Sequence, residues 1–195
     1  MTSVVEICNS ALNMLGASNI TAITEDSKNA RLCNQRYEPI RDAVFRTHSW
    51  NCLISRSQLA ADTEVPAFEY AKQYTLPVDC LRVLKIGSHA DGSSSDLDNG
   101  QTFKVEGRKI ITDEPEMFLT YIAIKSDPNT YDTLLIETIA ARLAAEISYA
   151  ITQSVSLSST LEDLYQIKLK EARFTDATEG TPSVIDSSTF INSRY

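Results

Sequence analysis

The sequence predicts a mainly α fold with a β insertion (α+β). We expect an antiparallel helical bundle, a small antiparallel β element between its second and third helices, and an extended C-terminal arm. Apolar residues recur at helical spacing near both ends of the chain, and the segment between them loses that spacing and contains Pro66, Pro77 and Pro115. No helical stripe continues beyond residue 177. We therefore divide the chain into one domain, residues 1–177, and an arm, residues 178–195.

The N-terminal half of the bundle is predicted to consist of helices over about residues 3–15 and 27–47. Ser3 and Glu6 have the spacing of a capping box, and Gly16 suits a left-handed helix end. Pro39 lacks a backbone N–H, so a kink is expected near residues 35–39. The second helix carries one apolar stripe at spacings of three and four: Ala30, Cys33, Tyr37, Ile40 and Val44.

The insertion is expected over about residues 52–126. Short apolar runs bounded by turn residues predict strands over 80–86, 102–106, 108–112 and 118–124. The dipeptide Glu106-Gly107 between two of these runs predicts a hairpin turn. Residues 90–101 are rich in serine, glycine and aspartate and are read as a polar loop. It contains Asp91, Asp96 and Asp98.

The C-terminal half of the bundle is predicted as helices over about residues 129–152 and 159–174. Asp127 followed by Pro128 resembles a cap and a first-turn proline, and Ser159 with Glu162 resembles a second capping box. Arg142 and Glu146 are four positions apart and can form an ion pair. Leucines and isoleucines repeat every four residues in the first of these helices, and four alanines let a neighbouring helix approach closely: Ala140, Ala141, Ala144 and Ala145.

The composition restricts the class of function. The chain has 195 residues, a formal net charge of −8 and a pI of about 4.8. An acidic surface repels phosphates, which argues against tight or sequence-specific DNA binding but is compatible with a surface that DNA slides past. We see neither a secretion signal nor an apolar run approaching the roughly 20 residues of a membrane span.

Metal and catalytic sites are not predicted. The cysteines lack CxxC spacing and read as reduced core residues in preference to zinc ligands: Cys8, Cys33, Cys52 and Cys80. His48, beside Trp50, reads as a helix-terminal cation or a packed ring in preference to a general base. No phosphate-binding or nucleophile-elbow motif occurs, so we predict no catalytic residue, no cofactor and no metal.

Carboxylate pairs leave one enzymatic alternative, a virion-associated cell-wall or polysaccharide hydrolase. Glycosidases place two carboxylates about 5–10 Å apart across a cleft. The pairs in this chain fall in turns, where solvated or helix-start charges are the preferred interpretation. They are Glu25 with Asp26, Asp96 with Asp98, and Glu114 with Glu116.

Two further groups of residues suggest contact surfaces. One is a row of arginines along the second helix, which we interpret as an exposed or subunit-contact face in preference to a phosphate-binding one, because nearby acidic residues can neutralise it. The arginines are Arg31, Arg36, Arg41 and Arg46. The other is the C-terminal arm, in which polar spacers separate isolated apolar residues. Composition favours a docking arm and an ordinary frayed terminus about equally. The apolar residues of the arm are Val184, Ile185, Phe190, Ile191 and Tyr195.

The sequence resembles the tail tubular protein A family, the head-to-tail adaptors of short-tailed bacteriophages. The order and spacing of several stretches carry this likeness, which extends over about residues 5–182 and leaves the last dozen residues outside it. The stretches are 11–16, 26–33, 37–43, 48–51, 74–83, 105–113, 140–144 and 168–172.

The resemblance implies a function in virion assembly. It implies a ring of twelve copies below the portal protein, a passage for double-stranded DNA that it does not bind sequence-specifically, and a platform for the tail nozzle protein. The arm from about residue 178 would grip the portal, and the polar loop with its three aspartates would contact tail components. Tail fibres or tailspikes are further candidate partners. The expected location is the head–tail junction of the virion, after assembly in the bacterial cytoplasm and without a membrane.

Overall fold

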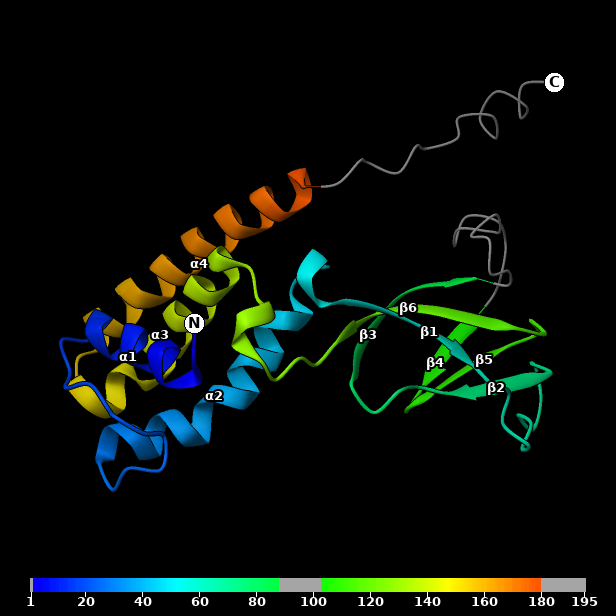
Figure 1. Cartoon of the computed structure of the whole chain (residues 1–195), viewed down its shortest axis with the longest axis horizontal. Helices are drawn as coiled ribbons and strands as arrows, with labels where there is room; N and C mark the ends of the chain where they lie inside the picture. The colour runs from blue at the N-terminus through cyan, green and yellow to red at the C-terminus, as the bar shows by residue number, and fades with distance from the viewer. Residues whose placement is uncertain (1, 88–102, 180–195) are drawn as a thin grey trace.

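The computed structural model describes residues 2–87 and 103–179, and within them the fold is α+β, with four α-helices and two small antiparallel sheets. The helices form a body at one end of an elongated molecule and the strands form a module at the other (Figure 1). The elements in chain order are α1 (Val4–Met14), α2 (Lys28–Arg46), η1 (Asn51–Leu53), β1 (Ile54–Leu59), β2 (Lys72–Thr75), β3 (Cys80–Gly87), β4 (Phe103–Glu106), β5 (Lys109–Thr112), β6 (Met117–Ala123), η3 (Pro128–Thr130), α3 (Thr133–Thr152) and α4 (Val155–Thr178).

Helix α3 is the centre of the helical body, because it packs against α1, α2 and α4. Three of its alanines, Ala140, Ala141 and Ala144, are fully buried, and Leu143 and Ile139 lie beside them in the same core. Small side chains allow neighbouring helices to approach closely, so the alanine-rich sequence suits this central position. By contrast, α4 packs mainly on α3.

The capping residues define where each helix begins. The predicted capping box is confirmed in α1, where the Ser3 amide donates to Glu6 at 2.8 Å and the Glu6 amide donates to the Ser3 hydroxyl at 3.2 Å. Gly16 follows α1 with a φ of +66°, the left-handed backbone expected there. Helix α2 is capped by the Ser27 hydroxyl and continues through Pro39 without a break. Pro39 cannot donate to the Gln35 carbonyl, and that loss alone does not end the helix.

Two predicted helix starts are wrong. Asp127 caps the short helix η3, and Asp132 caps α3 by accepting from the amides of Leu134 and Leu135. Helix α4 begins at Val155, four residues before the predicted start, because the Ser154 hydroxyl accepts from the Leu157 amide. The box predicted at Ser159 and Glu162 therefore lies inside α4.

The β module consists of two three-stranded antiparallel sheets, in the orders β1-β6-β3 and β2-β5-β4. Side chains from both sheets form one apolar core, in which Tyr74, Ile110, Met117 and Leu119 are almost fully buried. The four predicted strands are confirmed to within a residue or two at their ends, while β1 and β2 were not predicted. Gly107 occupies the first position of the β4–β5 turn with a φ of +59°, the conformation that a glycine in a type II′ hairpin adopts.

The four cysteines are free thiols; three are buried and Cys52 is partly buried. The prediction of reduced core residues is confirmed for the buried three. Cys8 on α1 and Cys33 on α2 are neighbours, and the hydrogen bond from Cys33, together with burial, raises the pKa of the Cys8 thiol well above its usual range. Residues 2–87 and 103–179 contain no cluster of three metal-ligating side chains. None of the helices in those ranges has the length and hydropathy needed to cross a membrane.

Candidate functional site: the joint between the helical body and the β module

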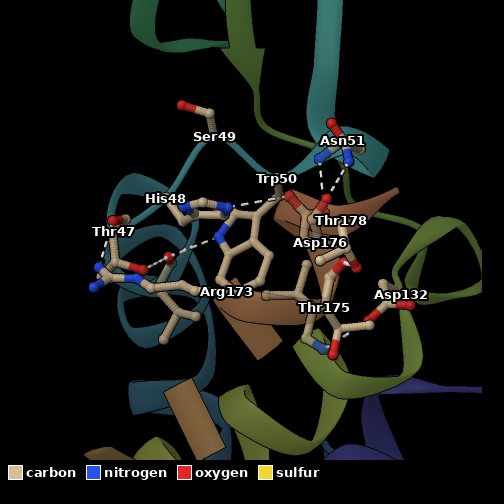
Figure 2. Close-up of polar contacts among 12 residues, drawn as sticks. Thr47, His48, Ser49, Trp50, Asn51, Asp132, Arg173, Thr175, Asp176 and Thr178 are labelled. Atoms are coloured by element: carbon tan, nitrogen blue, oxygen red, sulfur yellow. Dashed lines mark hydrogen bonds and ion pairs between the residues drawn. The ribbon is translucent and has the colours of Figure 1, made fainter. Parts of the chain in front are cut away.

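A polar cluster lies where the end of α2, the helix η1 and the last turns of α4 meet (Figure 2). We call it the joint cluster, and its members are Thr47, His48, Ser49, Asn51, Arg82, Arg173 and Asp176. It brings together segments that lie more than 120 residues apart in the chain.

Asp176 is the centre of the joint cluster. Its side chain is only 5% exposed, and one carboxylate oxygen accepts from His48 Nε2 at 3.1 Å. The other carboxylate oxygen accepts from the Asn51 amide at 3.0 Å, and the Asn51 side chain donates to the Asp176 carbonyl at 2.8 Å. Because a buried carboxylate needs donors, these contacts fix the end of α4 against η1.

A second set of contacts fixes the same end of α4 to α2. The Arg173 guanidinium donates to the Thr47 carbonyl, near the C-terminus of α2. Trp50 is fully buried beneath the cluster, and its indole N–H donates to the Val44 carbonyl at 3.2 Å. The His48 ring meets Trp50 edge to face, with centroids 5.0 Å apart. The indole therefore supports the imidazole from below while Asp176 holds its Nε2 atom.

The β module is attached to the joint cluster through β3. Arg82 donates to the Arg46 carbonyl at 3.0 Å and to the Ser49 hydroxyl at 2.7 Å. In return, the Arg46 guanidinium donates to the Leu81 carbonyl. These reciprocal bonds connect the end of α2 with the start of β3, so one joint orients α4 and the β module relative to each other.

The four arginines predicted to form a row on α2 do not share one exposed face. Arg31 pairs with Asp26, and Arg46 belongs to the joint. Arg41 is buried, bonded to Asp42 at 2.9 Å and stacked 5.9 Å from the rings of two aromatic neighbours, Tyr37 and Phe45. Its aromatic neighbours and carboxylate partner explain why a charged side chain is stable in the core.

Arg36 takes part in a ladder of ion pairs that crosses three helices. Arg36 on α2 contacts Glu146 on α3 at 2.9 Å, and Glu146 contacts Arg142 at 3.3 Å, the i,i+4 pair expected from the sequence. Arg142 also contacts Glu162 on α4 at 2.7 Å and lies 5.1 Å from the ring centroid of Tyr165. The ladder links α2 to α4 across the surface of α3.

Replacing Arg142 with methionine should lower the free energy of unfolding by about 1–2 kcal/mol, because two ion pairs and one cation–π contact are lost. Since these groups are partly exposed, the loss should shrink in about 1 M salt, where the Debye length falls to about 3 Å. Urea denaturation at low and high salt measures both effects. Lys170→Met on α4, which removes an exposed cation, is the control. A loss that does not depend on salt would contradict the ladder's electrostatic role.

Several predicted features fall outside this cluster or outside the described residues. His48 has the packed position beside Trp50 that the sequence favoured. Glu25 lies in a turn and accepts from the backbone and hydroxyl of Thr21, contacts that lower the pKa of its carboxyl. The loop aspartates Asp91, Asp96 and Asp98 and the arm residues Val184, Ile185, Phe190, Ile191 and Tyr195 lie outside the described residues.

Sequence reasoning missed Asp176, Asn51, Arg82 and Arg173. One signal could have identified Asp176. It continues the apolar stripe of α4 at helical spacing, after Leu169 and Ala172, so a carboxylate is placed where a buried residue belongs. A carboxylate at such a position indicates a partner elsewhere in the fold. That partner could not be named, because Asn51 lies 125 residues away.

The joint cluster has the chemistry of a structural clamp. Its carboxylate, imidazole and guanidinium groups contact the chain's own backbone and side chains, and these contacts connect α4, the end of α2 and the start of β3. No family model matches this chain, and no curated protein matches it.

Proposed function

We propose that this protein is a structural head-to-tail adaptor of a tailed bacteriophage. In this proposal it forms a ring, of twelve copies, below the portal protein. The ring extends the channel for double-stranded DNA and offers a platform to the tail nozzle protein, with tail fibres or tailspikes as further candidate partners. Its place is the head–tail junction of the virion, reached after assembly in the host cytoplasm.

The observation that carries the proposal is that stretches resembling the tail tubular protein A family contribute to the joint. His48 and Asn51 belong to one such stretch and hold Asp176, while Arg82 belongs to another and holds the end of α2. An adaptor needs a rigid angle between the part that forms the ring and the part that meets the tail. A clamp at that point supports such a role, with the helical body in the ring and the β module projecting from it.

The charge balance supports the same role. A net charge of −8 disfavours adhesion of DNA to the ring, so a duplex could pass without being held. The predicted arm, residues 178–195, begins at Thr178, the last residue of α4, and α4 is anchored at the joint. In the proposal these residues form the arm that binds the portal, with their apolar side chains as the anchors.

The test is to mix the protein with portal rings of the same phage and to image the products by electron microscopy. The full chain should form a second ring on the portal. A chain ending at Glu179 should fold normally and show at least a tenfold loss of portal binding. The cut follows Glu179 because α4 extends to Thr178.

The matched control keeps the length of the arm and changes only its chemistry. Serines replace Val184, Ile185, Phe190 and Ile191, and this variant should bind as poorly as the shortened chain. Normal portal binding by the shortened chain would refute the role of the arm. A full chain that never associates with portal rings would refute the adaptor itself.

A further inference from the structure

The sheet β1-β6-β3 has one face in the core of the β module and a second face that points outward (Figure 1). Leu119 and Tyr121 of the central strand β6 belong to that core, so Phe118 and Thr120, which alternate with them, lie on the outer face. Partners across an antiparallel ladder share a face, and the pairing places two rows of three residues there. We call them the outer patch: Gln58, Phe118 and Gly87 in one row, and Arg56, Thr120 and Lys85 in the next.

The outer patch is basic, although the whole chain has a net charge of −8. Arg56 and Lys85 flank Thr120 on the two neighbouring strands, and none of the positions in the patch holds a carboxylate. Arg56 is exposed and makes no hydrogen bond or ion pair within residues 2–87 and 103–179. The cations of the patch are therefore not neutralised by carboxylates of the same sheet face.

The sheet β2-β5-β4 shows the opposite arrangement, because its lysines have carboxylate partners. Lys104 on β4 contacts Glu69 at 2.6 Å, and Lys109 on β5 contacts Asp62 at 3.3 Å. The same module thus neutralises the cations of one sheet and leaves the outer face of the other sheet positive. A surface of this kind favours an anionic partner.

Phe118 occupies the middle of the first row and is the aromatic residue of the patch. Its side chain is partly buried, yet within the described residues it packs into neither apolar core of the protein. Its neighbours in the row are Gln58 and Gly87, and a glycine has no side chain to cover that side of the ring. Arg56 and Lys85 are its diagonal neighbours, about 7–8 Å away, a separation that long side chains can span.

An aromatic ring bordered by cations on an open sheet has the chemistry that single-stranded nucleic acid requires. Unpaired bases stack on aromatic side chains, while arginine and lysine contact the phosphates. A duplex already stacks its bases internally, so it has no free base for Phe118. An acidic peptide satisfies the two cations but supplies no base to stack on the ring. Single-stranded nucleic acid is the partner that uses both features of the patch.

We infer that the outer patch binds single-stranded nucleic acid, with one base stacked on Phe118 and the flanking phosphates held by Arg56 and Lys85. Stacking and phosphate contacts do not distinguish the bases, so binding is independent of sequence. It is weak and sensitive to salt, because the patch is small and the chain as a whole is acidic. The inference does not rest on the adaptor function, since it concerns the β module alone.

Fluorescence anisotropy with a labelled oligothymidylate of about 12 nucleotides tests the role of the ring. At about 50 mM salt the unmodified protein should bind it with a dissociation constant of about 10–100 µM. Phe118→Leu keeps an apolar side chain but removes the ring, and should weaken binding at least fivefold. A sugar–phosphate oligomer of the same length without bases should lose as much. Equal binding of the oligomers with and without bases refutes the stacking.

The dependence of binding on salt tests the two cations. For single strands, the slope of log affinity against log salt is about −0.7 for each phosphate neutralised, so two contacts predict a slope of about −1.4. Arg56→Gln should reduce the slope to about −0.7. Lys104→Gln on the other sheet is the matched control and should leave it unchanged, because Lys104 pairs with Glu69. An unaltered slope in Arg56→Gln refutes the phosphate contact, whether or not Phe118→Leu folds.

Two further ligands separate this partner from its alternatives. A duplex of the same length and a glutamate peptide of the same charge should both bind more weakly than the single strand. Equal or tighter binding of either one overturns the inference, because the ring then has no part in recognition. A protein that forms rings on the portal but does not bind the single strand up to about 1 mM loses this inference and keeps the adaptor. The reverse result keeps the inference and loses the adaptor.

Discussion

Replacing Trp50 with alanine should lower the free energy of unfolding by about 3–5 kcal/mol. The indole is fully buried, donates to the Val44 carbonyl and supports the His48 ring from below. Its removal leaves a cavity and an unsupported imidazole at the joint, while the Val44 carbonyl keeps the amide and hydroxyl of Thr47 as donors. Because folded domains are stable by only about 5–15 kcal/mol, this one change should bring the protein close to unfolding at 37 °C.

Urea denaturation followed by circular dichroism measures this loss, since the variant lacks the chain's one tryptophan as a fluorescence probe. Phe68→Ala is the matched control. It also deletes an aromatic ring, but Phe68 is 80% exposed in the loop before β2, so the free energy of unfolding should change by less than about 0.5 kcal/mol. A loss below about 1 kcal/mol for Trp50→Ala would mean that the joint is not a core element.

Asp176→Ala should lower the free energy of unfolding by about 3 kcal/mol, because the His48 ring and the Asn51 amide lose their acceptor in a buried place. Asp176→Asn should cost less. The asparagine oxygen still accepts from the Asn51 amide, while its NH₂ group faces His48 Nε2 and requires the other tautomer of the ring. The order of the two variants tests whether hydrogen bonding or the shape of the side chain determines the effect.

Hydrogen exchange at the Asn51 amide gives a local measure alongside denaturation. That amide should exchange much faster in Asp176→Ala, and amides near the middle of α3 should change no more than the global loss of stability requires. Asp163→Ala on the exposed side of α4 is the matched control and should leave the Asn51 amide protected. Unchanged exchange at Asn51 in Asp176→Ala would show that the joint closes without its carboxylate.

The bundle could be predicted because its signals are local. Apolar spacing identified all four helices, since a helix that buries one face must repeat its apolar residues every three or four positions. Ser3 and Glu6 placed the start of α1 correctly for the same reason, because both residues of the box lie in one turn. At α4 the sequence analysis chose Ser159 as the cap, whereas the structure places the cap at Ser154, directly after Gln153, the left-handed C-cap of α3 with a φ of +56°.

The strands β1 and β2 could not be predicted because their signals are not local. β1 has polar residues in its middle and is a strand because it pairs with β6, which lies about 60 residues further along the chain. The joint depends even more on distant contacts, since its key bonds connect residues near position 50 with residues near position 176. Spacing along the sequence carries no information about such pairs. Among the joint residues, Asp176 alone has a local signal, because it is a carboxylate at a position where the apolar stripe of α4 predicts a buried residue.

The pairing of β1 with β6 has a consequence for how such a chain can diversify. Ile54 and Ile122 are partners across these strands, so the insertion leaves and re-enters the helical scaffold at neighbouring points. Partners in an antiparallel pair lie only about 5 Å apart, a gap that a two-residue turn can close. Natural recombination or a protein engineer could therefore graft a foreign domain in place of the outer part of the module, provided that Ile54, Ile122 and the contacts of β3 with the end of α2 are kept.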